Sequence, residues 1–322
     1  MAARRKVILD VDTGTDDAVA LMVAALHPGL ELVAATTVAG NVPLDRTTEN
    51  TLRVLDHIGA AVPVHAGRDR PLVREPRSRP TTDRAGVSRI HGDFLDLPSS
   101  RSRPASERAV DFLIETFLAA SDEITLVATG PETNVAAALR LEPRLAARIP
   151  HLVVMGGGHE TGNVTPSAEF NVWADPEAAQ AVFRAGIDRL TVVPLDATHR
   201  ALVSLDDCVR LRTLSTPAST AAAAFVERRI RAYDETQPMT RPGAAPVHDA
   251  LAVAILVEPG LVTTERVHAD VETRGELTDG RTVFDRHRRG GLAPNAEVAF
   301  DADEAGFVRL LTETLGRTFG EA

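Results

Sequence analysis

The sequence predicts a single-domain α/β protein with a Rossmann-like open sheet that is mainly parallel and carries helices on both faces. Two observations support this prediction. Short aliphatic runs alternate with segments of helical spacing, and most of these runs end in Thr, Gly, Asn or Asp. Alternating strands and helices form parallel sheets, and ligands bind such sheets outside the carboxyl ends of the strands. We therefore expect one domain over residues 1–322, with its active site at that edge.

The first part of the chain contains three predicted strands and two predicted helices. The strands cover residues 6–11, 31–41 and 61–67, and the helices cover residues 16–27 and 43–59. The first strand is aliphatic with little polar alternation, which is typical of a strand buried on both faces. A Pro-Gly pair ends the first helix, and a proline stands at the start of the second.

Residues 68–103 interrupt this alternation. They are rich in Arg, Pro, Ser and Asp and contain only a short apolar island, SRIHGDFLDLP. Their mixture of basic, acidic and proline residues favours a solvated loop over a phosphate-binding surface. Loops of this length in compact domains are often functional, so we predict a long surface loop that is a candidate active-site lid.

Strand and helix patterns return after the loop and continue to the C-terminus. The predicted strands cover residues 123–130, 151–158, 189–196, 266–273, 281–287 and 296–303. The predicted helices cover residues 105–121, 131–141, 175–186, 205–214, 219–235, 247–259 and 304–316. No internal repeat is present, which is consistent with one domain.

Composition excludes several classes of protein. The chain has 35 Lys and Arg against 45 Asp and Glu, a net charge of -10, which argues against nucleic acid as a partner. Cys208 is the only cysteine, so no internal disulfide can form. No apolar stretch is long enough for a signal peptide or a membrane span. These features predict a soluble, cytoplasmic protein that contacts neither nucleic acid nor membrane.

Four carboxylates lie close together in the stretch VILDVDTGTDDA, residues 7–18, at the predicted turn from strand to helix. Asp16 could simply cap the helix and Asp17 could lie in its first turn, where the helix N-terminus favours negative charge. Asp10 lies inside the apolar run and Asp12 at its end, where an uncompensated charge is costly. Hard cations such as Ca²⁺ and Mg²⁺ bind such sets of carboxylates, so we predict a cation site here.

Two other chemistries could use a stretch of this kind. An EF-hand loop requires a preceding helix and a Glu at its twelfth position, whereas a strand precedes Asp10 and Leu21 holds that position. An aspartate-based phosphohydrolase of the haloacid dehalogenase type would use Asp10 as nucleophile and Asp12 as acid or base. That chemistry needs a further lysine, and Lys6 is the only lysine in the chain.

The stretch DVDTGTDDA resembles the N-terminal signature of the nucleoside hydrolase family, the inosine-uridine preferring N-ribohydrolases. Further family motifs follow in order: TTVAGN ending at Asn41, HG at His91, ATGPETN around Thr129, MGGG at Met155, GNVTPSAEFNVWADPEAA from Gly162 and VHDALAV at His248. The resemblance extends over roughly residues 5–300. It implies an enzyme that hydrolyses the N-glycosidic bond of ribonucleosides to base and ribose.

The resemblance also implies a set of calcium ligands. These are Asp12, Asp17, Asp249 and the backbone carbonyl of Thr129, with Asp12 acting in addition as the general base. Carboxylate and carbonyl oxygens suit a hard cation, and the chain lacks the cysteine set or paired histidines expected for zinc. We therefore expect Ca²⁺ as cofactor.

Short polar side chains are expected to hold the ribose hydroxyls. The predicted residues are Asp16, Asn41, Asn163, Glu169 and Asn171, and Met155 is predicted to contact the sugar. Since Glu169 and Asn171 alternate, we expect them to share one face of a short extended stretch. A site built to bond hydroxyl groups rejects 2′-deoxyribose, because its buried polar groups would be left unpaired.

Three residues are candidates for contact with the base. The resemblance implies that His248 protonates the leaving base and that His91 lies over it. Tyr233, the only tyrosine, could stack on the base or could cover an apolar edge. Base preference depends on residues 68–103 and on the region of Tyr233, so purine and pyrimidine ribonucleosides both remain open. Family resemblance further implies a homo-oligomer, a dimer or tetramer, and the alternative to an enzyme is a nucleoside-binding or inactive relative.

Overall fold

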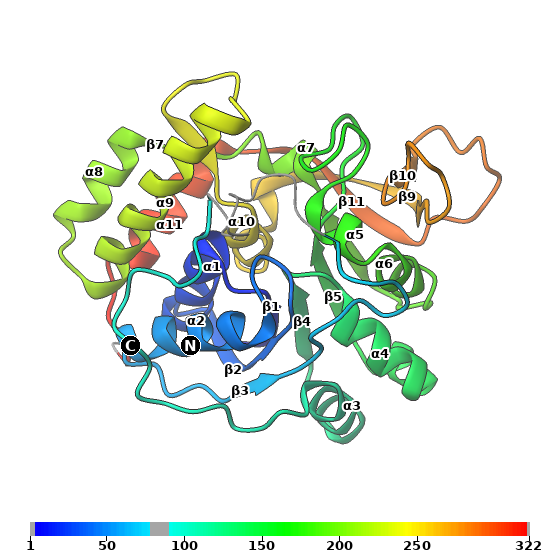
Figure 1. The fold of residues 1–322 in the computed structure, drawn as a ribbon, viewed down its shortest axis with the longest axis horizontal. Helices are drawn as coiled ribbons and strands as arrows, with labels where there is room; N and C mark the ends of the chain where they lie inside the picture. Colours follow the sequence, from blue (N-terminus) through cyan, green and yellow to red (C-terminus); the bar gives the residue numbers. More distant parts are fainter. Residues whose placement is uncertain (1–3, 78–89, 321–322) are drawn as a thin grey trace.

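A nine-stranded sheet forms the centre of the protein in the computed structural model, which describes residues 4–77 and 90–320 (Figure 1). In sheet order the strands are β10 (Thr282–Asp285), β9 (Val262–Val271), β11 (Ala296–Ala302), β6 (Leu190–Val193), β5 (His151–Met155), β4 (Ile124–Ala128), β1 (Arg5–Val11), β2 (Leu30–Thr37) and β3 (Val64–Ala66). The strands from β3 to β11 run parallel, and β9 is antiparallel to both β10 and β11. The predicted mainly parallel sheet is confirmed.

Helices cover both faces of this sheet (Figure 1). They are α1 (Thr15–Leu26), α2 (Leu44–His57), α3 (Ala109–Ala119), α4 (Thr133–Leu141), α5 (Phe170–Ala174), α6 (Pro176–Phe183), α7 (Leu195–Thr198), α8 (Leu205–Thr213), α9 (Pro217–Thr236), α10 (His248–Ala254) and α11 (Glu304–Leu315), with the short 3-10 helices η1 (Pro143–Ala147) and η2 (Pro259–Leu261). Two further strands, β7 (Leu202–Ser204) and β8 (Ala244–Pro246), form a separate antiparallel pair. That pair was not predicted.

The two faces of β1 contribute to two apolar cores. Val7, Leu9 and Val11 pack into the core that contains α1, α9, α10 and α11. Ile8 packs into the core that contains α3, α4 and α6. Because both faces of β1 are covered, the carboxylates at its end enter the protein interior rather than the solvent.

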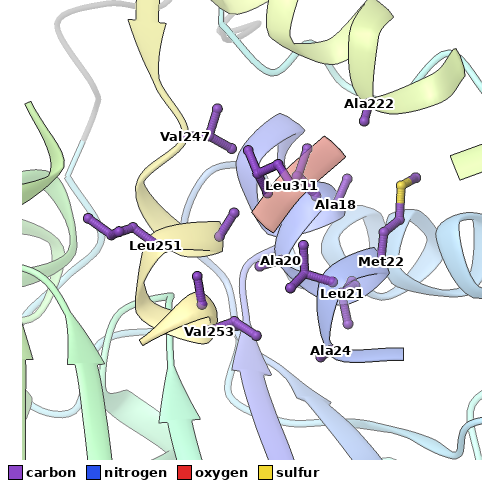
Figure 2. Packing of buried hydrophobic residues seen from close by; sticks show 14 of the residues in the cluster. Ala18, Ala20, Leu21, Met22, Ala24, Ala222, Val247, Leu251, Val253 and Leu311 are labelled. Atoms are coloured by element: carbon purple, nitrogen blue, oxygen red, sulfur yellow. The ribbon is translucent and has the colours of Figure 1, made fainter. Parts of the chain in front are cut away.

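Helix α1 is buried along its whole length. Every residue of the helix is buried, and its alanines allow close contact with α10 and α11. In Figure 2, helix α1 with Ala20 and Leu21 lies beside helix α10 with Leu251 and Val253. The N-terminus of α1 therefore lies inside the molecule together with Asp16 and Asp17.

Several predicted element boundaries are wrong, among them the end of the second strand and the start of the helix after the loop. The predicted strand 31–41 ends at Thr37, because the chain leaves the sheet when the Ala39 N–H donates to the Arg68 carbonyl. The predicted helix 105–121 begins only at Ala109. The preceding residues run along β3 instead, where the Ala105 N–H donates to the carbonyl of Val64 at 2.7 Å.

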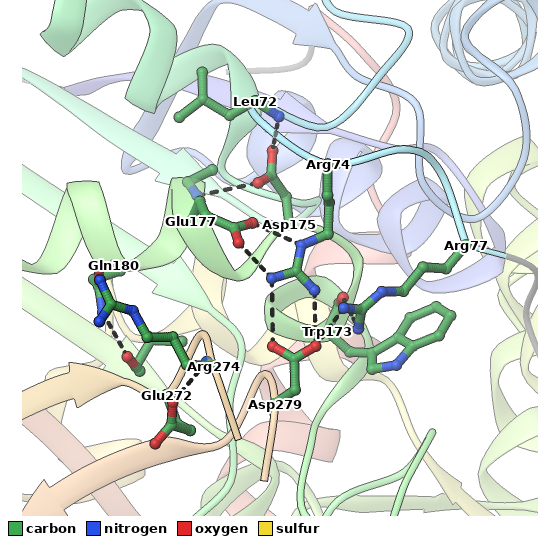
Figure 3. A network of polar contacts seen from close by, with 12 residues as sticks. Leu72, Arg74, Arg77, Trp173, Asp175, Glu177, Gln180, Glu272, Arg274 and Asp279 are labelled. Carbon is green, nitrogen blue, oxygen red and sulfur yellow. Dashed lines mark hydrogen bonds and ion pairs between the residues drawn. The ribbon is translucent and has the colours of Figure 1, made fainter. Parts of the chain in front are cut away.

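The loop over residues 68–103 contains no helix or strand in its described parts, 68–77 and 90–103. Residues 78–89 lie outside the described residues, and so does that part of the predicted lid. Figure 3 shows Arg74 bridging Glu177 at the start of α6 and Asp279 between β9 and β10. Arg77 pairs with the same Asp279. These ion pairs fix the first flank of the loop to the body of the protein.

Within the described ranges, none of the helices combines the length and apolar composition that a membrane span requires.

Candidate active site

A small cavity of about 40 Å³ lies among the segments that follow β1, β2, β4 and β5. The predicted site residues that line it are Asp16, Asn41, His91, Thr129, Met155, Asn163, Glu169, Asn171, Tyr233, His248 and Asp249. Asp12 and Asp17 are buried and are bonded to residues of this lining. The sheet therefore brings all predicted site residues together, although they are spread over more than two hundred positions of the chain.

Three buried carboxylates form the centre of the site. Oxygens of Asp16, Asp17 and Asp249 all lie within 4.8 Å of one another. Burial, and then the charge of Asp16, raise the pKa of Asp17 to about 7. Burial raises the pKa of Asp249 well above its ordinary range, and the charges of Asp16, Asp17 and Asp12 raise it further. The protein alone thus stabilises the ionised form of this cluster poorly.

Asp17 is held by donors from three separate segments. Its carboxylate accepts hydrogen bonds from the Gly14 N–H at 2.9 Å, the Thr129 hydroxyl at 2.9 Å and the Asn41 side-chain amide at 3.3 Å. The first of these bonds is a cap of α1. These bonds fix the position of the carboxylate at the start of the helix, where the helix dipole also favours negative charge.

The donors of this site suit a hard divalent cation. Carboxylates are its ligands, and in the part of the chain that the structure describes only Asp16, Asp17 and Asp249 form such a cluster of potential ligands. Asp12 borders the cluster, since its charge raises the pKa of Asp249, and one of its oxygens accepts from the Asn41 N–H at 2.6 Å. The Thr129 carbonyl accepts a hydrogen bond from the Asn171 amide at 2.7 Å. The assignment of Asp12 and this carbonyl as ligands stays a prediction.

Asp10 lies in the same sequence motif but outside the cavity. It is buried within the sheet, where one oxygen accepts from the Thr36 hydroxyl at 2.5 Å and from the Asn134 amide at 2.8 Å. Burial raises its pKa to about 6. A nucleophile must reach its substrate, so this location argues against the phosphohydrolase alternative.

Arg229 of α9 is a site residue that the sequence analysis missed. Its side chain is buried, and its guanidinium lies 2.8 Å from Asp16. It also donates to the Thr15 hydroxyl at 3.2 Å and to the Pro246 carbonyl at 3.0 Å. One signal was available, because Arg229 and Tyr233 are four residues apart and share a face of the predicted helix. Other residues of the cavity lining, which were not among the predicted site residues, are Ile90, Val164, Phe170 and Gln237.

The predicted extended stretch at Glu169 and Asn171 is wrong, because Glu169 is the N-cap of helix α5. Its carboxylate accepts from the backbone N–H groups of Asn171, Val172 and Gly157 at 2.9, 3.2 and 2.9 Å. Both residues nevertheless line the cavity, since the helix starts at its wall. The Asn171 amide donates to the strand-end carbonyl of Met155 at 3.0 Å.

A buried histidine and tyrosine form another wall. The Tyr233 hydroxyl lies 2.7 Å from Nε2 of His248, and Nδ1 of His248 lies 2.7 Å from the Thr198 hydroxyl. Burial, followed by the charge of Arg229, lowers the pKa of His248 well below its ordinary range. Tyr233 is thus more than a cover for an apolar edge, because its hydroxyl is bonded to an imidazole inside the site.

His91 is fixed against the N-terminus of α1. The Thr15 N–H donates to Nδ1 of His91 at 3.1 Å. Since Nδ1 is the acceptor of this bond, the proton of the neutral ring lies on Nε2. The ring packs closely on Gly14, where an added Cβ would lie 2.0 Å from Nδ1. His91 therefore approaches the site through a contact that only glycine permits.

Asn50 of α2 links the acidic turn to the segment that carries His91. Its amide donates to the Thr13 carbonyl at 3.0 Å, and its oxygen accepts from the Leu95 N–H at 3.0 Å. This side chain is buried. Asn50 therefore fixes the distance between the second flank of the loop and the turn that carries the carboxylates.

Comparisons with known proteins agree with this geometry. The family described as inosine-uridine preferring nucleoside hydrolase matches residues 7–309. The pyrimidine-specific ribonucleoside hydrolase RihA of Escherichia coli O7:K1 is 38% identical over 314 residues, covering 96% of this chain and 97% of that protein. The RihA of Salmonella schwarzengrund is 40% identical over 310 residues, with the same coverage.

Solved structures are similar over the same length. A purine-preferring ribonucleoside hydrolase from Gardnerella vaginalis has a TM-score of 0.88 and 32% identity, covering 97% of this chain and 98% of that one. A plant nucleoside hydrolase also has a TM-score of 0.88, with 29% identity over 98% of this chain and 99% of that one. The sequence and the fold thus point to the same group of enzymes.

Proposed function

The chain belongs to the inosine-uridine preferring nucleoside hydrolase family, and we propose that it hydrolyses ribonucleosides in this cavity by a calcium-dependent reaction that releases free base and ribose. The observation that carries the proposal is the cluster of Asp16, Asp17 and Asp249, whose oxygens lie within 4.8 Å of one another in the wall of the cavity. Such a cluster needs a compensating cation to hold its charges in the interior.

We assign the cation to Asp12, Asp17, Asp249 and the Thr129 carbonyl, the set that the family resemblance implies. Burial of the three carboxylates and their oxygen-only chemistry support the assignment. Bound Ca²⁺ would offset the repulsion that raises the pKa of Asp17 and Asp249, and would lower the pKa of a bound water.

Asp12 is the proposed general base. The Asn41 N–H donates to one oxygen of its buried carboxylate at 2.6 Å and so fixes its orientation. The carboxylate takes a proton from the attacking water as the water oxygen bonds to C1′ and the bond from C1′ to the base breaks. Attack on the face opposite the base inverts the configuration at C1′.

Acceptors in the cavity wall suit the ribose hydroxyls. Asp16 and Glu169 offer carboxylates, and Oδ1 of Asn163 is buried with no hydrogen-bond partner among the described residues. Three backbone N–H groups hold Glu169 in place. A sugar that lacks the 2′-hydroxyl would leave one of these acceptors unpaired, so the enzyme should prefer ribonucleosides over 2′-deoxyribonucleosides.

His248 is the proposed acid for the departing base, with Tyr233 bonded to its Nε2. The low pKa of the buried His248 means that little of the ring carries a second proton near pH 7, but that such a proton is given up readily to a nitrogen of the base. His91 supplies a second donor, because its Nε2 carries the proton when Nδ1 accepts from Thr15. Both groups act on the base, whereas the carboxylates act on water and sugar.

Pyrimidine ribonucleosides are the proposed preferred substrates. The supporting observation is the 38% and 40% identity, over nearly the whole chain, to two relatives described as pyrimidine-specific. Purine ribonucleosides are the second candidate, supported by the Gardnerella vaginalis structure at 32% identity. We further propose that residues 68–103 act as a lid, since Ile90 and His91 from this loop line the cavity. The family resemblance also supports a cytoplasmic homo-oligomer, a dimer or tetramer.

The decisive experiment measures ribose release from uridine, cytidine, inosine, adenosine and 2′-deoxyuridine, with and without prior removal of calcium by a chelator. We expect release from the ribonucleosides that stops after removal and returns with Ca²⁺. Ribose release that persists without any divalent cation would contradict the calcium-dependent mechanism. A protein that binds nucleosides and releases no ribose would be an inactive, nucleoside-binding relative.

A further inference from the structure

Asp16 lies where two different roles are open to it. Its carboxylate belongs to the cluster with Asp17 and Asp249 that could bind a cation. It also lines the cavity, where it could accept a hydrogen bond from a ribose hydroxyl. Which role Asp16 takes depends on the groups that contact its carboxylate.

Arg229 is the feature that contacts Asp16 directly. The guanidinium lies 2.8 Å from the Asp16 carboxylate. Three further contacts fix the guanidinium, namely the Thr15 hydroxyl at 3.2 Å, the Pro246 carbonyl at 3.0 Å and the ring of Tyr233, whose centroid lies 5.5 Å away. Because these partners come from α1, the end of β8 and α9 itself, the position of the charge is set by the fold.

We propose that Arg229 is a positioning residue that reserves Asp16 for the ribose and keeps it from acting as a calcium ligand. This inference rests on the proposed nucleoside hydrolysis. A carboxylate in contact with a buried guanidinium must break that ion pair before it can bind a cation. The carboxylate can still accept a hydroxyl hydrogen bond while it is paired.

The electrostatics of the neighbouring residues support this role. The guanidinium of Arg229 lies 2.8 Å from Asp16, whose oxygens lie within 4.8 Å of those of Asp17 and Asp249. Arg229 therefore offsets part of the cluster's charge before any cation binds. Affinity for Ca²⁺ depends on the number of carboxylates in the site, so Arg229 should hold that affinity below the maximum that the aspartates could provide.

The test compares Arg229→Met with Arg229→Lys. Methionine fills the buried space without a charge, and lysine keeps the charge. The first measurement is Ca²⁺ affinity by calorimetry on calcium-free protein, which requires no substrate. We expect Arg229→Met to bind Ca²⁺ about tenfold more tightly, because Asp16 becomes an additional ligand. Arg229→Lys should stay close to the wild type, and Arg231→Met at an exposed position of α9 is the matched control.

The second measurement is the ratio of kcat/KM for uridine over 2′-deoxyuridine. Loss of an oriented charged acceptor should lower this ratio about tenfold or more in Arg229→Met. Asp16→Asn should lower the ratio by a similar factor, and combining it with Arg229→Met should lower it little further. A merely structural role would reduce activity on both nucleosides equally.

Two outcomes would overturn the inference: unchanged or weaker Ca²⁺ binding in Arg229→Met, and full additivity of the two substitutions. If Arg229→Met does not fold, the double variant with Asp16→Asn removes both charges and tests the same point. In that case the double variant should bind Ca²⁺ at most a few-fold more tightly than Asp16→Asn alone, because it loses the positive charge of Arg229 but has no Asp16 to add as a ligand. Wild-type protein that releases ribose from neither nucleoside would contradict the proposed function, while the calcium measurement would still report on Arg229.

Discussion

Two groups of buried carboxylates meet the same edge of the sheet, and they differ in what surrounds them. Asp10 accepts from Thr36 and Asn134, and Asp175 accepts from the Thr133 hydroxyl at 2.6 Å as well as from two backbone N–H groups. We call Asp10 and Asp175 the bonded carboxylates. Asp12, Asp16, Asp17 and Asp249, which we call the facing carboxylates, also have donors but lie beside one another as well.

The difference separates structural carboxylates from functional ones. Burial raises the pKa of Asp10 and Asp175, and in both cases hydrogen-bond donors lower it again. Burial also raises the pKa of Asp17 and Asp249, and here the charge of Asp16 is the second-largest cause and raises the pKa further, although hydrogen bonds lower that of Asp17. Donors supplied by the fold can hold a single carboxylate, whereas a group of facing carboxylates requires a cation from outside. Four experiments test this distinction.

The largest expected effect is that of Asp12→Asn compared with Asp10→Asn. Asparagine cannot take a proton from water, so Asp12→Asn should lower kcat about a hundredfold or more while the fold is kept. Asp10→Asn should keep kcat within about tenfold of the wild type, because its oxygen can still accept from Thr36 and Asn134. Steady-state kinetics with uridine and circular dichroism of both variants provide the measurement. Near-native turnover in Asp12→Asn would remove Asp12 as the base.

The next effect concerns a residue outside both groups. If the facing carboxylates act on water and sugar, departure of the base must depend on His248 and its partner Tyr233. His248→Ala should lower kcat/KM for inosine about a hundredfold, because its base leaves poorly without a proton. The same variant should lower kcat/KM for a nitrophenyl riboside only a few-fold, since that leaving group departs as an anion. Equal loss for both substrates would argue against His248 as the acid.

A third prediction concerns stability in the presence of calcium. A cation that binds only the folded protein stabilises it by about 2.7 kcal/mol at a concentration of one hundred times Kd. Thermal unfolding of the wild type should therefore shift to higher temperature with added Ca²⁺, and Asp17→Asn should abolish most of this shift. Asp175→Asn should keep the shift even if it lowers the unfolding temperature itself. A calcium shift that survives in Asp17→Asn would place the cation elsewhere.

The sequence predicted those features that depend on local pattern. The apolar run of β1 and the helix that follows it indicate where Asp16 and Asp17 lie, and parallel strands place their carboxyl ends at one edge. The same pattern could not separate Asp10 from Asp12. Asp10 is held inside the sheet by Thr36 and Asn134, whereas Asp12 borders the cavity. The positions of Thr36 and Asn134 follow from strand register and from the packing of α4.

Contacts between distant segments were beyond local pattern. Arg229 and Asp16 are 213 positions apart, and their ion pair follows from the packing of α9 on α1. The stretch at Glu169 was predicted to be extended because alternating polar residues favour a strand. A helix forms there instead, because the Glu169 carboxylate caps it by accepting from the N–H groups of the next two helix residues, Asn171 and Val172. The distant Gly157 N–H also donates to this carboxylate.

The smallest effect tests a carboxylate that belongs to neither group. Glu132 is fully buried, and neither of its oxygens has a hydrogen-bond partner among the described residues. Burial raises its pKa well above 4.5, and the charges of Glu169, Asp175 and Asp10 raise it further. Like a facing carboxylate, Glu132 is buried near other carboxylates, but in the described part of the chain no cation site lies among them to offset its charge. If facing carboxylates need a cation to stay ionised, Glu132 must therefore be protonated in the folded protein.

Glu132→Gln replaces this protonated carboxyl with a neutral group of the same shape. In the wild type the folded state keeps a proton that the unfolded chain loses above pH 4.5. Stability is therefore fully present below that pH and falls as pH rises toward the folded pKa, by at most about 1.4 kcal/mol per pH unit for one proton. The free energy of unfolding in urea, measured from pH 4.5 upward, should fall less steeply in Glu132→Gln than in the wild type, with the exposed Glu107→Gln as control. If the free energy of unfolding depends on pH equally in the wild type and in Glu132→Gln, Glu132 is ionised in the folded protein. In that case neighbouring carboxylates alone do not explain the difference between the bonded and the facing carboxylates.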